Sequence, residues 1–436
     1  MKKNKRANKT TRRDFIKTTA AVGVAAVLPA KQRLFAAGSD KLRVGLIGCG
    51  WRGTEAAEDC VKAAPNIEVV AMGDIFQDQL DWSLAKLSRE ADDKVSITQD
   101  TSFVGFDAYE KVIACDVDMV ILGTPPHFRP LHLKAAVQAG KHVFMEKPVA
   151  VDPPGIRSII ASSELAKQKG LAIVAGTQRR HQEHYLEIIK RIHNGDIGEI
   201  VSGQCYWNMG DLWVERATEN MQKRNALAWS DMEWQCRNWL FLTWLSGDHI
   251  VEQHVHNLDI INWALGAHPV QCMGMGGRQV RTGPEYGNIF DHFAVEYEYP
   301  NGVRVSSMCR QTGGCHEIVA ERLTGTNGQT YTDGSTGYVE GQNPYKYEGE
   351  SPNPYVQEHT DLIASIREGR PLNEGKRIAE STMTAIMGRM SAYTGRALKW
   401  DWAMNASKLD LSPPSYDFAV DFPPRPVAVP GKTPLV

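Results

Sequence analysis

One stretch late in the chain places imidazoles and carboxylates at helical spacing. Read as a single helix over residues 246–266, with 100° per residue, it brings Glu252, His256 and Asp259 to the same face as His249. A different face is largely apolar and suited to packing. Because unpaired buried charge costs several kcal/mol, a row of two imidazoles and two carboxylates indicates chemistry rather than packing.

The chemistry that fits this row is oxidation of a secondary alcohol, which removes the hydroxyl proton as hydride leaves the carbon. The pKa of a histidine lies near neutrality, and a carboxylate one turn away can orient it. A lysine close by can polarise the reacting oxygen. We therefore predict His256 as acid/base, Glu252 as its orienting carboxylate, Lys147 as the polarising cation and Asp259 as a ligand of substrate hydroxyls.

Two other interpretations of the row remain open. His254 and His256 with Glu252 could hold a metal ion, but positions i and i+2 on a helix point about 200° apart unless the helix is broken. A purely structural, paired helix is the second alternative. We predict no metal.

Near the start of the chain, well before these residues, the sequence contains a dinucleotide-binding pattern. An apolar strand, residues 42–48, leads into G-x-G-x-x-G and a helix, residues 54–64. Glycine allows the tight turn at Gly48, close approach of a pyrophosphate at Gly50 and close helix–strand packing at Gly53. The predicted cofactor ligands here are Gly48, Gly50, Trp51, Arg52 and Gly53.

An acidic residue follows at the distance that this pattern requires. A second strand, residues 67–72, ends in Gly73-Asp74, and Asp74 lies 21 residues after Gly53. Its carboxylate can accept hydrogen bonds from a ribose diol and would repel a 2′-phosphate, which favours NAD over NADP. The alternative is a glycine-rich turn with a solvated aspartate.

Further strands, residues 118–122 and 141–145, flank a helix over residues 131–140. Ligands bind at the carboxyl ends of such parallel strands. The residues predicted to contact the cofactor at these ends are Thr124, Pro125, His127, Glu146 and Lys147.

These motifs together resemble the Gfo/Idh/MocA family of NAD(P)-dependent oxidoreductases, over residues 40–405. The resemblance implies an α/β fold: an N-terminal Rossmann doubly wound parallel sheet, then an α/β domain with a large, mostly antiparallel open sheet. It also implies sugar, inositol or related polyol substrates, Lys147 in contact with cofactor and substrate, and a homo-oligomer built on the open sheet. The family pattern Asp-x-x-x-His matches Glu252 and His256, with glutamate where aspartate is usual.

The second half of the chain alternates in strand fashion, which predicts a division into residues 40–175 and 176–405. C-terminal helices, residues 358–368 and 377–394, are expected to pack back on the first domain. The proline-rich tail, residues 411–436, is expected to lie over the surface or a neighbouring subunit.

Substrate contacts are expected at two further places. A strand end precedes Arg179, Arg180 and His181, whose alternative role is a helix cap with solvated charges. Tryptophans cluster between residues 207 and 244, and sugar C–H faces stack on indole, although a core role is the alternative. The predicted substrate contacts are Arg179, Arg180, His181, Trp239 and Asp259.

The charge of the chain is divided unevenly. Residues 1–37 hold ten Lys or Arg and one acid, so the remainder carries a net charge of −11 and has no global electrostatic reason to bind nucleic acid. Adjacent Arg12 and Arg13, followed by an apolar run too short to span a bilayer, resemble a twin-arginine export signal. The alternative is a disordered basic tail. We predict a signal peptide read by the twin-arginine machinery and a periplasmic or otherwise exported protein.

Export would restrict how the protein obtains its cofactor. Outside the inner membrane there is no free NAD pool, so the cofactor is expected to be tightly bound. The first hypothesis is an exported NAD-dependent oxidoreductase acting on a sugar, inositol, polyol or glycoside. The alternative is NAD-dependent glycoside hydrolysis or lyase chemistry, with transient oxidation of the sugar and no net redox change. A third, a sugar-binding protein without catalysis, is disfavoured because the motifs are intact.

Overall fold

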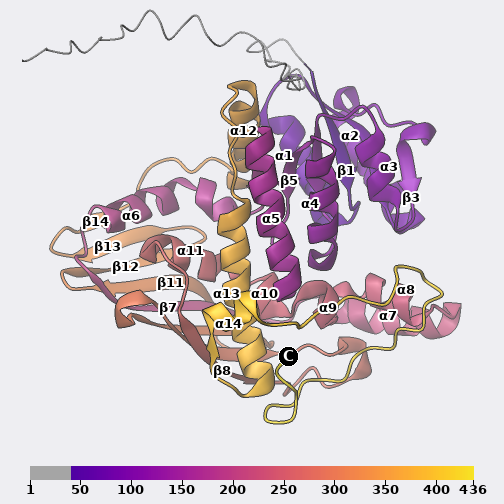
Figure 1. Ribbon diagram of the computed structural model, residues 1–436. Helices are drawn as coiled ribbons and strands as arrows, with labels where there is room; N and C mark the ends of the chain where they lie inside the picture. The colour runs from indigo at the N-terminus through magenta and orange to yellow at the C-terminus, as the bar shows by residue number, and fades with distance from the viewer. Residues whose placement is uncertain (1–40) are drawn as a thin grey trace, which may run out of the picture.

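A computed structural model describes residues 41–436, so the predicted leader over residues 1–37 lies outside the described residues. In the described chain, six strands form a parallel sheet in the order β3-β2-β1-β4-β5-β6 (Figure 1). They are β1 (Leu42–Ile47), β2 (Ile67–Asp74), β3 (Ser102–Val104), β4 (Met119–Leu122), β5 (His142–Met145) and β6 (Ile173–Ala175). This order is that of a doubly wound dinucleotide-binding sheet, which confirms the predicted fold of the first half.

Alternate residues of these strands face two separate cores. In β4, Met119 and Ile121 belong to the core with α1 and α2, whereas Val120 and Leu122 face α3, α4 and α5. The helices are α1 (Trp51–Ala63), α2 (Gln77–Ala91), α3 (Ala108–Ala114), α4 (Arg129–Gln138) and α5 (Pro153–Lys169). Both faces of the sheet are therefore covered, as the near-continuous apolar strands require.

A C-terminal helix completes the first of these cores. Helix α12 (Pro354–Arg367) adds Leu362, Ile363 and Ile366 to the core of α1 and α2, and Thr360 donates a hydrogen bond to the Ala63 carbonyl oxygen. The chain thus returns to the nucleotide-binding half after building the second sheet.

The second sheet of the described chain has nine strands in the order β14-β13-β12-β11-β7-β10-β9-β8-β15. Adjacent strands are antiparallel except β7 and β10. The strands are β7 (Ile200–Met209), β8 (Gln271–Gly277), β9 (His292–Glu298), β10 (Arg304–Gln311), β11 (Ile318–Gly325), β12 (Gly328–Asp333), β13 (Gly337–Gly341), β14 (Tyr345–Lys346) and β15 (Leu398–Lys399). The mostly antiparallel sheet confirms the expected fold class.

Helices cover one face of this sheet (Figure 1). They are α6 (Glu183–His193), α11 (Val255–Leu265) and α13 (Gly375–Thr394). The opposite face exposes Met273 and Met275 on β8 and Met308 on β10, the two strands that flank β9. The α/β half is therefore two-layered and open on one side.

The prediction of one helix over residues 246–266 is wrong. The segment forms α10 (His249–Glu252) and α11, separated at Gln253 and His254. Two tertiary contacts compete with the helical pattern there: Lys147 donates to the Glu252 carbonyl oxygen, and the His254 ring lies 2.7 Å from Ser307 Oγ. Helical periodicity carries no information about either contact.

Four further helices complete the fold of the described chain. They are α7 (Val214–Leu227), α8 (Asp231–Arg237), α9 (Thr243–Ser246) and α14 (Trp400–Asn405). After α14, the C-terminal tail, residues 411–436, runs out beside α9 toward α8 and turns back (Figure 1). No helix within residues 41–436 has both the length and the apolar character needed to cross a membrane.

Candidate active site

The turn after β1 shows why glycine occurs at each motif position. Gly48 has φ of +93°, and a Cβ on it would lie 2.5 Å from the Thr124 nitrogen. A Cβ on Gly53 would lie 2.0 Å from the Gly48 carbonyl oxygen, whereas one on Gly50 would meet no described atom within 4 Å. Gly48 and Gly53 thus permit close packing, and Gly50 leaves open space in front of the α1 N-terminus. That space and the free N–H groups beside it fit a dinucleotide pyrophosphate.

Asp74 at the end of β2 is held in place by backbone donors. Its carboxylate accepts hydrogen bonds from the Cys49 N–H at 2.7 Å and the Phe76 N–H at 2.9 Å. Burial raises the pKa of Asp74 to about 6 despite these donors. The side chain lines the same cleft as Gly50, where a ribose diol could donate to it.

Arg52, inside the glycine motif, connects three segments. Its Nε donates to Glu146 Oε1 at 2.6 Å, and its guanidinium lies 3.6 Å from Glu358 of α12. Burial disfavours its charge, but Glu146 and Glu358 together raise the pKa of Arg52 above its ordinary value. The Tyr355 ring lies 4.9 Å from the same guanidinium. Arg52 therefore fixes the glycine loop to Glu146, the residue before the predicted catalytic lysine.

The three predicted catalytic residues lie in one cleft. Lys147 Nζ lies 3.0 Å from Glu252 Oε1 and also donates to the Glu252 carbonyl oxygen. Burial, and then the positive charges of Lys147 and Arg179, hold the pKa of His256 well below its usual range. The His256 Nδ1 has no hydrogen-bond partner among the described residues. Glu252 thus contacts Lys147 rather than the histidine that it was predicted to orient.

The ring of His256 is positioned by packing. It stacks on Trp207 of β7 with ring centroids 5.7 Å apart and planes 19° apart. On Trp207 in turn lies the Arg179 guanidinium, 5.6 Å from the ring centroid, and Arg179 is paired with buried Glu321 at 2.6 Å. This stack keeps the His256 ring facing the cleft, while burial and the nearby cations keep it neutral.

The cleft has a volume of about 1320 Å³, large enough for a dinucleotide and a small substrate together. Of the predicted cofactor ligands, His127 does not line it: its Nε2 lies 2.8 Å from the hydroxyl of Tyr416 in the tail. The predicted ligands that do line it are Gly48, Gly50, Trp51, Arg52, Asp74, Thr124, Pro125, Glu146 and Lys147. Gly53 lies behind the loop, against Gly48.

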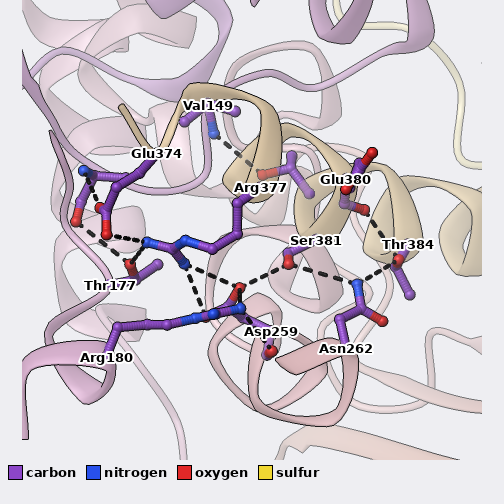
Figure 2. Close-up of polar contacts among 12 residues, drawn as sticks. Val149, Thr177, Arg180, Asp259, Asn262, Glu374, Arg377, Glu380, Ser381 and Thr384 are labelled. Atoms are coloured by element: carbon purple, nitrogen blue, oxygen red, sulfur yellow. Dashed lines mark hydrogen bonds and ion pairs between the residues drawn. The ribbon is translucent and has the colours of Figure 1, made fainter. Parts of the chain in front are cut away.

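Trp239 lines the cleft, whereas the other predicted substrate contacts do not. Arg180 and Asp259 form a bidentate ion pair at 2.8 and 2.9 Å, and Arg377 of α13 joins them at 3.3 Å (Figure 2). His181 Nδ1 lies 2.5 Å from Asp361. Arg180 and His181 belong to the 3₁₀ turn after β6, and their partners lie on α11 and α12 rather than in the cleft. Buried charge requires such partners.

Gln178, Gln253 and Tyr355 line the cleft without a sequence signal of their own. Gln253 stands at the break between α10 and α11, a position that the single-helix interpretation hid. Its amide oxygen accepts a hydrogen bond from Gln311 of β10. His254 faces Ser307 while His256 faces the cleft, and no group of three metal-ligating side chains occurs among the described residues.

Family models match most of the chain. Residues 42–177 match the oxidoreductase family with the NAD-binding Rossmann fold, and residues 185–331 match the GFO/IDH/MocA C-terminal domain. Residues 9–29 match the twin-arginine translocation pathway signal sequence, which indicates export by that route.

Individual curated proteins match a smaller share of the chain than the family models do. It is 31% identical to 2,7-anhydro-N-acetylneuraminate hydratase of Escherichia coli (strain K12), over 43% of this chain and 44% of that protein. It is 30% identical to inositol 2-dehydrogenase of Klebsiella pneumoniae (strain 342), over 51% and 54%. The chain thus spans about half the length of these curated relatives.

A solved structure has a similar fold. Aldose-aldose oxidoreductase from Caulobacter crescentus, complexed with glycerol, superposes with a TM-score of 0.64 at 18% identity, over 82% of this chain and 99% of that one. With both halves matched by family models and the fold shared, the chain belongs to the Gfo/Idh/MocA oxidoreductase family.

Proposed function

We propose that the protein is an exported NAD-dependent oxidoreductase that acts on a secondary alcohol of a sugar, inositol or related polyol. The observation that carries this proposal is the shared cleft: Lys147, Glu252 and His256 line the same space as Gly50 and Asp74. Inositol 2-dehydrogenases among the relatives support the substrate class.

The cofactor proposed for the cleft is NAD, tightly bound. A nicotinamide held there would accept a hydride from the substrate carbon and can return it. The α1 N-terminus and the open space at Gly50 suit its pyrophosphate. Asp74 favours NAD over NADP, since a carboxylate beside the ribose would repel a 2′-phosphate. Tight binding follows from export, because no free pool replaces a lost cofactor.

His256 is proposed to take the hydroxyl proton and Lys147 to polarise the oxygen that loses it. The lowered pKa keeps the imidazole neutral, the form that can accept a proton. Lys147 projects from the end of β5 into the cleft, where its charge stabilises negative charge developing on oxygen.

Glu252 is proposed to position Lys147. Glutamate is one methylene longer than the aspartate usual at this position, and its carboxylate lies 3.0 Å from the lysine Nζ. The stacked indole of Trp207 fixes the plane of the His256 ring, whose Nδ1 has no carboxylate partner among the described residues. Trp239 offers an apolar face to a sugar ring.

The test is a substrate panel assayed on NAD-loaded protein. Inositols and free aldoses are expected to reduce the bound cofactor, observed by its absorbance. His256→Ala should retain bound NAD and lose this reduction, and Lys147→Ala should also lose the reduction, whereas Lys111→Ala, a surface lysine paired with Asp107, should behave as wild type. Release of aglycone from aryl glycosides without reduced cofactor would contradict a simple dehydrogenase. Absence of bound or bindable NAD would contradict the cofactor.

The proposal extends to the assembly of the protein. We infer a homo-oligomer formed on the open face of the nine-stranded sheet, supported by the exposed Met273, Met275 and Met308. We also keep the division into residues 40–175 and 176–405 as the proposed domain boundary.

A further inference from the structure

A third hydrophobic core is built from three distant parts of the chain. The nucleotide-binding half contributes Phe76 and Phe128, the segment from α8 to α9 contributes Trp234 and Trp244, and the tail contributes Leu411 and Phe422. The tail thus covers part of this core as it runs beside α9 toward α8 (Figure 1).

Ring stacking and hydrogen bonds hold the tail in place. The Phe418 ring stacks on Phe76, with centroids 5.5 Å apart and planes 15° apart, and lies 4.9 Å from Phe106. The Phe422 carbonyl oxygen accepts a hydrogen bond from Gln235 of α8 at 2.5 Å, and the Leu411 N–H donates to Asp152 at 2.9 Å. The tail therefore contacts both halves of the molecule at once.

The two ring contacts of Phe418 lie behind one wall of the cleft. Phe76 and Phe106 line the cleft, and Phe76 follows Asp74 by two residues. The wall that the tail supports is thus the one expected to face the adenosine of the cofactor.

Helix α8 closes the same end of the cleft from the other half. Arg237 forms a bidentate ion pair with Asp78 of α2 at 3.0 and 3.2 Å. Its guanidinium carbon lies 3.8 Å from the Phe76 ring centroid. Phe76 therefore contacts Arg237 of α8 and Phe418 of the tail, and moving α8 away from α2 would break both the ion pair and the ring contact.

We propose that the C-terminal tail holds α8 against the nucleotide-binding half and so retains the dinucleotide in the cleft through successive turnovers. This inference rests on the proposed function, since it assumes that the cleft holds NAD. Separation of α8 from α2 would widen the adenosine end of the cleft, and the tail contacts both sides of that opening, at Phe76 and at Gln235. Retention of this kind allows an exported enzyme to work without a cofactor pool.

The first test measures escape of the cofactor. Full-length protein is loaded with labelled NAD and chased with excess unlabelled NAD, and the bound label is followed over time. Phe418→Ala removes both ring contacts and should raise the dissociation rate of NAD about ten-fold or more. Tyr338→Ala, which removes a stacked ring from the distant sheet face, is the matched control and should leave the rate unchanged. Equal rates in wild type and Phe418→Ala would overturn the proposal.

The second test needs no variant and therefore remains valid if Phe418→Ala fails to fold. We expect the docked tail to slow release of NAD more than entry, and so to raise the affinity of the cleft for NAD; binding of NAD must then stabilise the docked tail by the same free energy. Hydrogen exchange of amides in residues 411–422 should slow when NAD is added to nucleotide-free protein, and exchange unaffected by NAD would overturn the proposal. Failure of the wild type to bind NAD would instead contradict the proposed function, so the two failures are distinguishable.

Discussion

The clearest consequence for a single residue concerns Asp74. A carboxylate that accepts hydrogen bonds from a ribose diol binds best when ionised, and its pKa without cofactor is about 6. The affinity for NAD should therefore fall as the pH is lowered through 6. Asp74→Asn should weaken NAD binding roughly ten- to hundred-fold and remove this pH dependence. Calorimetric titration of nucleotide-free protein measures both effects, with Asp81→Asn in the same cleft as the control. An unchanged affinity would contradict the assigned role.

His256 gives a second prediction at this scale. Only the neutral imidazole accepts the hydroxyl proton, and burial with three neighbouring cations lowers the pKa of His256 well below 6.5. Oxidation by NAD-saturated enzyme should therefore stay active as the pH falls through 6.5 and decline only below it. A pH profile of kcat/KM for the substrate measures this directly. An acid limb at or above 6.5 would show that His256 is not the neutral base that the structure presents.

Local sequence predicted some residues of the site well and others poorly, for a physical reason. The roles of Gly48, Gly50 and Gly53 follow from the turn itself, so adjacent residues suffice to infer them. The partners of Arg179 and Asp259 lie 142 and 79 residues away, at Glu321 and Arg180. Nothing near these charges in the sequence shows that they are paired internally, so they were expected to bind substrate.

At the scale of elements, the break between α10 and α11 decides how the catalytic residues are arranged. An unbroken helix would place Glu252 beside His256 as an acceptor for its ring. The break frees the Glu252 carbonyl oxygen, which Lys147 binds together with the carboxylate. The positions of β1, β2, β4 and β5 were predictable from apolar runs and glycines, whereas this break depends on contacts with Lys147 after β5 and with Ser307 of β10.

The elements α11, α13 and the turn after β6 are connected by the buried network of Figure 2. Although burial favours its protonation, Arg180 and Arg377 lower the pKa of Asp259 to about 2. Asp259→Asn would leave the half-buried Arg180 without its anion, whereas Arg377 keeps its ion pair with Glu374, and should cost about 3 kcal/mol of unfolding free energy. Urea denaturation measures this loss, and Asp196→Asn, in the more exposed pair with Arg191, should cost less than 1 kcal/mol, as is typical near the surface. A comparable loss in the two variants would contradict the network.

At the scale of the whole molecule, the open face of the second sheet carries the proposed oligomer. Met275 is 73% exposed and lies opposite Ala294, which pairs in turn with Met308. A contiguous apolar strip of this kind is unusual on the surface of a monomer. Met275→Glu should shift the mass measured by light scattering toward the single chain, because a buried carboxylate would lack a partner. A wild-type protein that is already monomeric would contradict the interface.

The domain organisation of the molecule could be predicted from the sequence, whereas the position of its tail could not. The leader, the nucleotide-binding half and the β-rich half each have a local pattern that identifies them. The tail has only proline content, and proline excludes a helix without indicating a binding surface. Its docking depends on Phe76, Gln235 and Asp152, residues from three different elements.

The central claim is that this cleft transfers a hydride between a substrate carbon and a bound NAD. The most direct measurement uses a substrate from the panel carrying deuterium on the oxidised carbon, followed by mass spectrometry of the dinucleotide extracted after a single turnover. The account predicts one deuterium in the nicotinamide ring with wild type and none with Lys147→Ala. Conversion of the substrate with no deuterium in the dinucleotide would contradict it.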